Sequence, residues 1–292
     1  MIEVIPLKYG VTFKRIFSDP AVFSQFASDV LGIPIQVDQV FTEYEYPESV
    51  GYVKIKYDLF AEDAERRTII EVQHIREDDS FDRFLYYHLI ALAEQVRGFT
   101  AYRFDRNVYT IVVLTRQPRE KELQFSHAVS NMSPVNEFGK QIELYPHRLV
   151  FLGPRSVNDQ TPPQARPWLE LIADSLDSQI EEAKYGSELF HRIIERMRRS
   201  TISPEELSTI KDEAAWEEAK QNALAEGRAE GRAEGRAEGR AEGRAEGETE
   251  GRRQEKLAIA RALLASGAER SFIAQVTGLT EAELAEAFAG AA

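Results

Sequence analysis

An aspartate and a glutamate occupy facing positions in two neighbouring stretches of alternating apolar and polar residues. Residues 52–60 (YVKIKYDLF) and 68–75 (TIIEVQHI) have the two-residue period of β-strands. A hairpin centred on the polar loop between them places Asp58 directly opposite Glu71. Two carboxylates this close repel each other unless a cation lies between them. The pair therefore predicts a site for Mg²⁺ or Mn²⁺, ions that combine carboxylates with water and phosphate oxygens and assist phosphodiester hydrolysis.

Gln73 extends this candidate site, because it lies two residues after Glu71 and therefore on the same strand face. Its amide could bind a water molecule or a phosphate oxygen. Ile70 and Val72 are expected on the opposite face. From spacing alone, a plainer alternative stays open: Asp58, Glu71 and Gln73 could be ordinary polar residues on a solvated sheet face.

The elements around the candidate site predict an α/β core. Residues 12–31 have helical spacing and should form two helices separated at Asp19-Pro20. A strand over 35–46, the two strands of the hairpin, a helix over 81–96 and a buried strand over 108–115 follow. On the hairpin strand 52–60, Tyr57 and Leu59 are expected on one face and Asp58 on the other. A further strand is expected at Leu149–Leu152.

Residues 8–118 resemble the PD-(D/E)XK nuclease superfamily, and more narrowly its recombination-promoting nuclease (Rpn) and transposase group. The pieces that carry the resemblance are Phe13–Phe17 (FKRIF), Tyr57-Asp58, Ile70–Gln73 (IEVQ), Arg83, Tyr87, Gln95, Gly98, Tyr102 and Val108–Leu114. The resemblance implies a restriction-endonuclease-like core of order αβββαβ with a mainly helical C-terminal extension. It also implies that Asp58 and Glu71 are metal ligands and that Gln73 occupies the lysine position of the motif.

The sequence departs from the family pattern at two positions. Gly10 stands where the family often has aspartate, three residues before the Phe-Lys pair, and Gln73 stands in place of lysine. An amide cannot supply the positive charge that orients an attacking water. Lys56, two residues before Asp58 on the same predicted face, is one candidate to supply that charge, and Lys14 is another.

Beyond the predicted nuclease-like domain of residues 1–160, we expect a helical extension over 161–220, a repeat arm over 221–250 and a small helical tail over 251–292. The arm repeats Ala-Glu-Gly-Arg, so its Glu–Arg separations are never three or four, the spacings at which helix side chains meet. Each glycine costs a helix about 1 kcal/mol relative to alanine. We therefore expect a flexible or fraying arm.

The tail is expected to contain three helices and also resembles the ends of the Rpn group. Residues 252–265 are amphipathic, residues 271–276 form a short helix, and Thr280 and Glu283 form a capping box for the last one. This helix–turn–helix pattern suggests DNA reading. The only charged residues of the last helix are glutamates, however, which favours self-association or partner docking, and hence a possible homo-oligomer formed through these helices.

Composition limits the remaining choices. The 292-residue chain has no cysteine, so it has neither disulfides nor thiolate metal sites, and its net charge of −13 is unusual for a DNA-binding protein. It shows neither a long apolar run nor a signal-like start, from which we expect a cytoplasmic protein without membrane contact.

Together these features predict a Mg²⁺-dependent DNA endonuclease, a hydrolase linked to recombination or transposition. The alternative is a catalytically inactive nuclease fold that acts as a DNA- or protein-binding scaffold and oligomerises through its helical tail.

Overall fold

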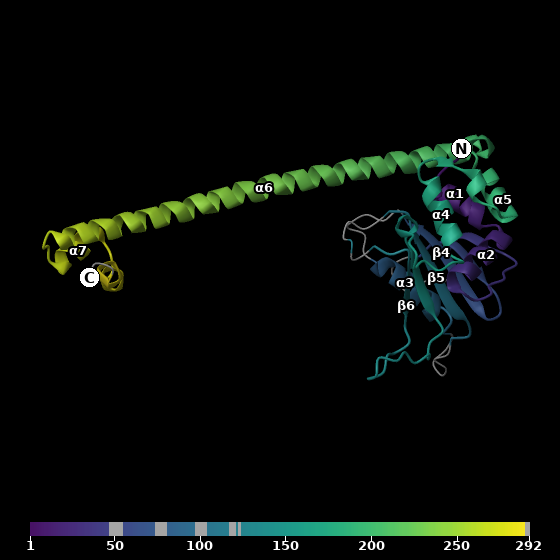
Figure 1. Cartoon of the computed structure of the whole chain (residues 1–292), viewed down its shortest axis with the longest axis horizontal. Coiled ribbons are helices and arrows are strands. Elements are labelled where there is room, and N and C mark those ends of the chain that lie inside the picture. Colours follow the sequence, from purple (N-terminus) through teal and green to yellow (C-terminus); the bar gives the residue numbers. More distant parts are fainter. Residues whose placement is uncertain (47–54, 74–80, 97–103, 117–120, 122–123, 290–292) are drawn as a thin grey trace. The chain divides into compact units, whose positions relative to one another are not determined.

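A computed structural model describes residues 1–46, 55–73, 81–96, 104–116, 121 and 124–289 (Figure 1). The chain divides into two compact units, Met1–Ala214 and Ala215–Ala292. The first residues of the predicted strand 52–60, and Gly98 and Tyr102 of the resemblance, lie outside the described residues. Within the described part of the chain, no helix is both long and apolar enough to cross a membrane.

A six-stranded mixed sheet of order β2-β3-β4-β5-β7-β6 forms the centre of the first unit. Its strands are β2 (Phe41–Tyr44), β3 (Tyr57–Glu62), β4 (Arg66–Gln73), β5 (Asn107–Leu114), β6 (His127–Asn131) and β7 (Arg148–Leu152). β4 is parallel to β5 and β5 to β7, whereas the other neighbours are antiparallel. The predicted α/β order and the strand at 149–152 are confirmed. β6 was not predicted, because its mixture of half-buried and exposed positions gives no clear alternation.

The helices begin and end at recognisable signals. Asp19 caps α2 (Pro20–Leu31) by accepting from the amide of Ala21 at 3.0 Å, and Gly32 ends it with φ of 67°. The predicted break between α1 (Gly10–Phe17) and α2 is thus confirmed. The other elements are α3 (Asp82–Ala93), α4 (Arg166–Ser175), α5 (Glu188–Met197), α6 (Pro204–Ala265), α7 (Arg270–Thr277), α8 (Glu281–Ala289), the paired short strands β1 (Ile2–Glu3) and β8 (Gln179–Ile180), and the 3₁₀ helices η2 (Pro154–Ser156), η3 (Glu182–Lys184) and η4 (Arg199–Thr201).

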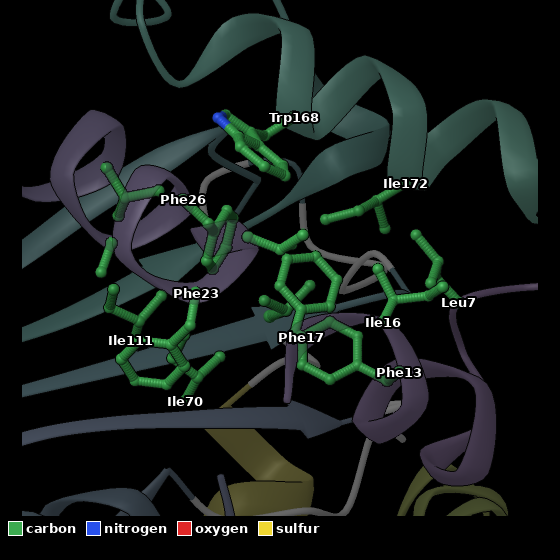
Figure 2. Packing of buried hydrophobic residues seen from close by; sticks show 14 of the residues in the cluster. Leu7, Phe13, Ile16, Phe17, Phe23, Phe26, Ile70, Ile111, Trp168 and Ile172 are labelled. Atoms are coloured by element: carbon green, nitrogen blue, oxygen red, sulfur yellow. The ribbon is translucent and has the colours of Figure 1, made fainter. Parts of the chain in front are cut away.

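The main core lies between one face of the sheet and helices α1, α2, α4 and α5. Figure 2 shows Phe17 and Phe26 beside Trp168 of α4, whose ring centroid lies 5.2 Å from that of Phe26. Ile70 and Ile111 of the sheet close this core from the other side. Helices α4 and α5, which fall in the predicted extension 161–220, therefore complete the core that α1 and α2 begin.

Helix α3 covers the opposite face of the sheet, and one predicted face assignment was wrong there. Tyr57 packs with Phe60 and Ile69 on the α3 side, whereas Leu59 packs in the main core. Strand alternation does not fix Tyr57, because β3 begins at this residue and its hydroxyl donates to the carbonyl of Tyr87 in α3 at 3.0 Å. The ring is thereby held on the α3 side.

A buried histidine on α3 should make the fold sensitive to acid. Nδ1 of His88 lies 2.9 Å from Oγ1 of Thr110, and Nε2 has no hydrogen-bond partner among the described residues. Burial, together with the charge of nearby His147, lowers the pKa of His88 from 6.5 to about 4. The unfolded chain therefore binds this proton more readily, so the contribution to stability is complete above pH 6.5 and is lost as the pH falls towards 4.

Between pH 7 and pH 4.5 the unfolding free energy should decrease by about 2–3 kcal/mol less in His88→Gln than in wild type. Urea denaturation at a series of pH values measures this slope. His191→Gln, at a half-exposed histidine, serves as the control. Equal acid slopes in wild type and His88→Gln would contradict the assignment.

The repeat arm is helical, so the prediction of a flexible or fraying arm was wrong. α6 runs without a break from Pro204 to Ala265 and contains the whole repeat. Side-chain pairing is not needed for such a helix, because Ala, Glu and Arg have high intrinsic helix propensity. Some arginines also fold back onto the backbone: Nε of Arg232 and of Arg240 each donates at 3.0 Å to the carbonyl four residues earlier.

Replacing glycines of the repeat should strengthen this helix. A Cβ added at Gly231, Gly235 or Gly239 meets no atom within 4 Å. We expect the triple alanine variant to gain about 1 kcal/mol per site in local helix stability. The far-UV circular dichroism at 222 nm should become more negative, and the arm should melt at higher temperature. Glycine substitutions at Ala229, Ala233 and Ala237 should do the opposite; unchanged spectra in both variants would argue against a helical arm.

The tail forms a small helical cluster of its own. Ala260 of α6, Ile273 of α7, Leu279 of the turn and Leu284 of α8 are buried together. The predicted capping box is confirmed: the amide of Thr280 donates to the carboxylate of Glu283 at 2.8 Å, and the amide of Glu283 donates back to the threonine hydroxyl.

Candidate active site

The hairpin formed by β3 and β4 has the predicted register. Leu59 pairs with Ile70 and Glu62 pairs with Arg67, which places Asp58 opposite Glu71 immediately beyond the paired segment. At this point the two carboxylates, and not backbone carbonyls, accept hydrogen bonds from backbone amides of the neighbouring strand. The amide of Asp58 donates to Oε1 of Glu71, and the amide of Val72 donates to Oδ2 of Asp58, each at 3.0 Å. Each acidic side chain is thus held against the other strand.

Both carboxylates are removed from water. Glu71 is 2% exposed and Asp58 is half-buried. Burial raises the pKa of Asp58, and burial together with the charge of Asp58 raises the pKa of Glu71 well above its usual value. None of the basic side chains that the structure describes forms an ion pair with either carboxylate. The negative charge of this pair is therefore poorly compensated within the described protein.

Gln73 lies on the same side of β4, where α3 contacts it. Nη1 of Arg83 donates to Oε1 of Gln73 at 3.2 Å, and Nε of Arg83 donates to the hydroxyl of Tyr87. Ile70 and Val72 face the main core instead, as predicted. The positive charge of Arg83 opposes the rise in pKa of both acidic residues. Arg83 therefore orients the amide of Gln73 and adds positive charge near the two carboxylates.

The two lysines named from the sequence meet at one carboxylate. Nζ of Lys14 and Nζ of Lys56 each lie 2.5 Å from an oxygen of Glu43, and together they lower the pKa of Glu43 to about 2. Glu43 has φ of 54°, a conformation that residues other than glycine rarely adopt.

The two lysines differ in how they relate to the acidic pair. The side chain of Lys14 is 21% exposed and that of Lys56 is 53% exposed. The charge of Lys14 opposes the rise in pKa of both Asp58 and Glu71. Lys14 is therefore the lysine with the stronger structural relation to the acidic pair. Glu43 was not singled out from the sequence, because nothing in its spacing distinguishes it from other acidic residues in a strand.

The donor set fits a hard divalent cation. Asp58 and Glu71 offer carboxylate oxygens from adjacent strands, the ligand type that Mg²⁺ and Mn²⁺ prefer. Among the described residues no three acidic or histidine side chains gather closely enough to enclose an ion. The arrangement therefore suits an ion that keeps water and takes substrate oxygens as its remaining ligands.

Comparison with known families agrees with this geometry. Residues 10–227 match the PD-(D/E)XK nuclease family transposase model, and residues 253–288 match the C-terminal HTH domain of the Rpn/YhgA-like nuclease family. No curated protein and no solved structure matches the chain.

Proposed function

Because the chain belongs to the PD-(D/E)XK nuclease transposase family, we propose that it is a metal-dependent DNA endonuclease that hydrolyses phosphodiester bonds during recombination or transposition. The observation that carries the proposal is the pair of Asp58, which is half-buried, and Glu71, which is buried: each carboxylate bonds to the other's strand, and both have raised pKa values. Burying two negative charges together is costly unless a cation compensates them. A bound divalent ion would provide that compensation.

In this proposal Asp58 and Glu71 hold Mg²⁺ or Mn²⁺. When bound, such an ion supplies Lewis acidity and a more acidic water. Gln73, oriented by Arg83 through its carbonyl oxygen, keeps amide hydrogens with which to position a water molecule. Lys14 and Lys56, the two candidates for the missing positive charge, contact the phosphate and offset its negative charge. The residues thus divide into two that bind the cation, one that orients water and one or two that bind phosphate.

DNA is the proposed partner in spite of the net charge of −13. The charges of Lys14 and Arg83 act on both carboxylates of the pair, and Lys56 shares Glu43 with Lys14, so positive charge is available locally. The match to an HTH domain adds a second possible DNA contact in the tail. Helix α8 has only glutamates as charged residues, so for this helix we propose contact with a protein surface, such as a second copy of the chain.

The proposal is tested by incubating the purified full chain with supercoiled plasmid and with single-stranded DNA. Mg²⁺ or Mn²⁺ should permit nicking, and EDTA should stop it. Asp58→Ala, purified in parallel, controls for contaminating nucleases. Cleavage that persists unchanged in Asp58→Ala would remove this site from the reaction. Specific DNA binding without cleavage under all conditions would instead favour the inactive scaffold.

A further inference from the structure

A glutamate of α6 docks on the first turn of α1, about two hundred residues earlier in the chain. The amide of Gly10 donates to Oε2 of Glu213 at 3.0 Å, and the amide of Val11 also bonds to this carboxylate. Tyr9, the N-cap residue of α1, provides no side-chain cap. Free amides at a helix N-terminus attract negative charge. Glu213 of α6 therefore caps the N-terminus of α1.

The same carboxylate lies close to Lys14, a residue of the candidate active site. A Cβ added at Gly10 would lie 3.8 Å from Oε1 of Glu213 and 3.8 Å from Cε of Lys14, so the carboxylate and the lysine stem flank one position on α1. Burial raises the pKa of Glu213; the charge of Asp58 adds to this shift and that of Lys14 opposes it. Glu213 thus shares an electrostatic environment with both residues.

We propose that Glu213 is a positioning residue of the nuclease site, placed by α6 to add a third negative charge that attracts the divalent cation and balances Lys14. The inference rests on the proposed function. Glu213 is not a direct ligand, because the described residues contain no group of three acidic side chains that could hold one ion. It acts through the electric field and through Lys14. The carboxylate of Glu213 lies within ordinary contact distance of the position that a Cβ at residue 10 would take.

The competing explanation is that Glu213 only fastens α6 to α1. Glu206 provides a matched control, since it lies on the same helix and also bonds to α1, through Nη1 of Arg15 at 2.8 Å. Glu206→Gln and Glu213→Gln change the net charge equally, and each removes one charged link between the helices. Glutamine at 213 keeps a carbonyl oxygen that can still accept from Gly10. Glu213 differs from Glu206 in bonding to the backbone at Gly10, near Lys14, whereas Glu206 bonds to Arg15.

The test measures Mn²⁺ affinity of the full chain by isothermal titration calorimetry, without DNA or turnover. A charge that acts on a divalent cation across several ångströms of partly hydrated protein changes its affinity by about three- to tenfold. We expect Glu213→Gln to weaken Mn²⁺ binding by that factor and Glu206→Gln to leave it within about twofold. The melting temperatures of both variants are recorded to exclude unfolding.

A relocated charge separates the two explanations. Gly10→Asp adds a carboxylate next to the side chain of residue 213 from α1, where an added Cβ makes only ordinary contacts and φ is not positive. Combined with Glu213→Gln, it should restore Mn²⁺ affinity to within about twofold of wild type. Unchanged affinity in Glu213→Gln, or no restoration in the double variant, would leave Glu213 a structural cap and overturn the inference. Should wild type bind no Mn²⁺, or Asp58→Ala bind it equally well, the proposed function itself fails.

Discussion

Glu71→Gln should abolish metal-dependent DNA cleavage and at the same time stabilise the metal-free protein. Glutamine keeps the oxygen that accepts from the amide of Asp58, so the hairpin bonding is retained. It removes a negative charge that is 2% exposed and lies beside a second carboxylate. We expect cleavage to fall by about 10³-fold or more, because a charged cation ligand is lost. The melting temperature should rise by about 2–4 °C for each kcal/mol of relieved repulsion.

The stabilisation should depend on pH with a defined sign. The pKa of Glu71 is raised by burial and by Asp58, so the folded protein holds this proton more tightly than the unfolded chain. The destabilisation of the folded protein by ionised Glu71 is absent below the unfolded-state pKa of about 4.3. It reaches its full size only above the raised pKa of the folded state. Glu71→Gln should therefore stabilise the protein most at pH 8 and progressively less towards pH 4.

Thermal melts in EDTA and in Mg²⁺ measure both effects. Mg²⁺ should raise the melting temperature of wild type but not that of Glu71→Gln, because only the folded wild-type site binds it. Asp58→Asn should behave in the same way. Glu65→Gln, on the exposed loop of the same hairpin, should change neither cleavage nor stability. A Glu71→Gln protein that cuts DNA at the wild-type rate, or that melts lower than wild type in EDTA, would contradict the cation site.

The part of the site that could be predicted is the part that local sequence determines. Alternation over 52–60 and 68–75, with a polar loop between them, predicts a hairpin register, and the register brings Asp58 opposite Glu71. Gln73 follows from the same two-residue period. The break at Asp19-Pro20 and the capping box at Thr280 were predictable for a similar reason, because each depends on residues within one helical turn.

What could not be predicted depends on contacts between distant segments. Glu43 comes from an edge strand and Glu213 from a helix far along the chain, and neither has a spacing that relates it to Asp58. The face of Tyr57 depends on a hydrogen bond to α3. The repeat arm was mispredicted for another reason: its Glu–Arg spacing gives no side-chain pairs, but intrinsic helix propensity makes such pairs unnecessary in α6.

The second large effect concerns the positive charge that Gln73 does not provide. Lys14→Met removes the charge and keeps an apolar stem for packing, so it should lower cleavage by about 10²–10³-fold, the usual loss for one charge-assisted contact to a transition state. Lys56→Met should lower it by about tenfold or less, because that side chain is 53% exposed and its ion pair is with Glu43. Lys140→Met, at an exposed loop position outside the proposed site, is the control. Initial rates at saturating Mg²⁺ give the comparison.

The variant Gln73→Lys tests whether the lack of positive charge at this site limits the cleavage rate. The new ammonium would stand where Arg83 now contacts the amide oxygen, beside Glu71, and we expect cleavage to be retained or increased. In the double variant Lys14→Met/Gln73→Lys, the new lysine should recover most of the lost rate, because the position of the charge matters less than its presence near the phosphate. A double variant as slow as Lys14→Met alone would mean that Lys14 acts by holding Glu43 and α1, not by its charge.

If wild type, Gln73→Lys and both methionine variants are all inert with Mg²⁺ and Mn²⁺ on single- and double-stranded DNA, the nuclease proposal fails. The pairing of Asp58 with Glu71 would then belong to a nuclease fold that serves binding.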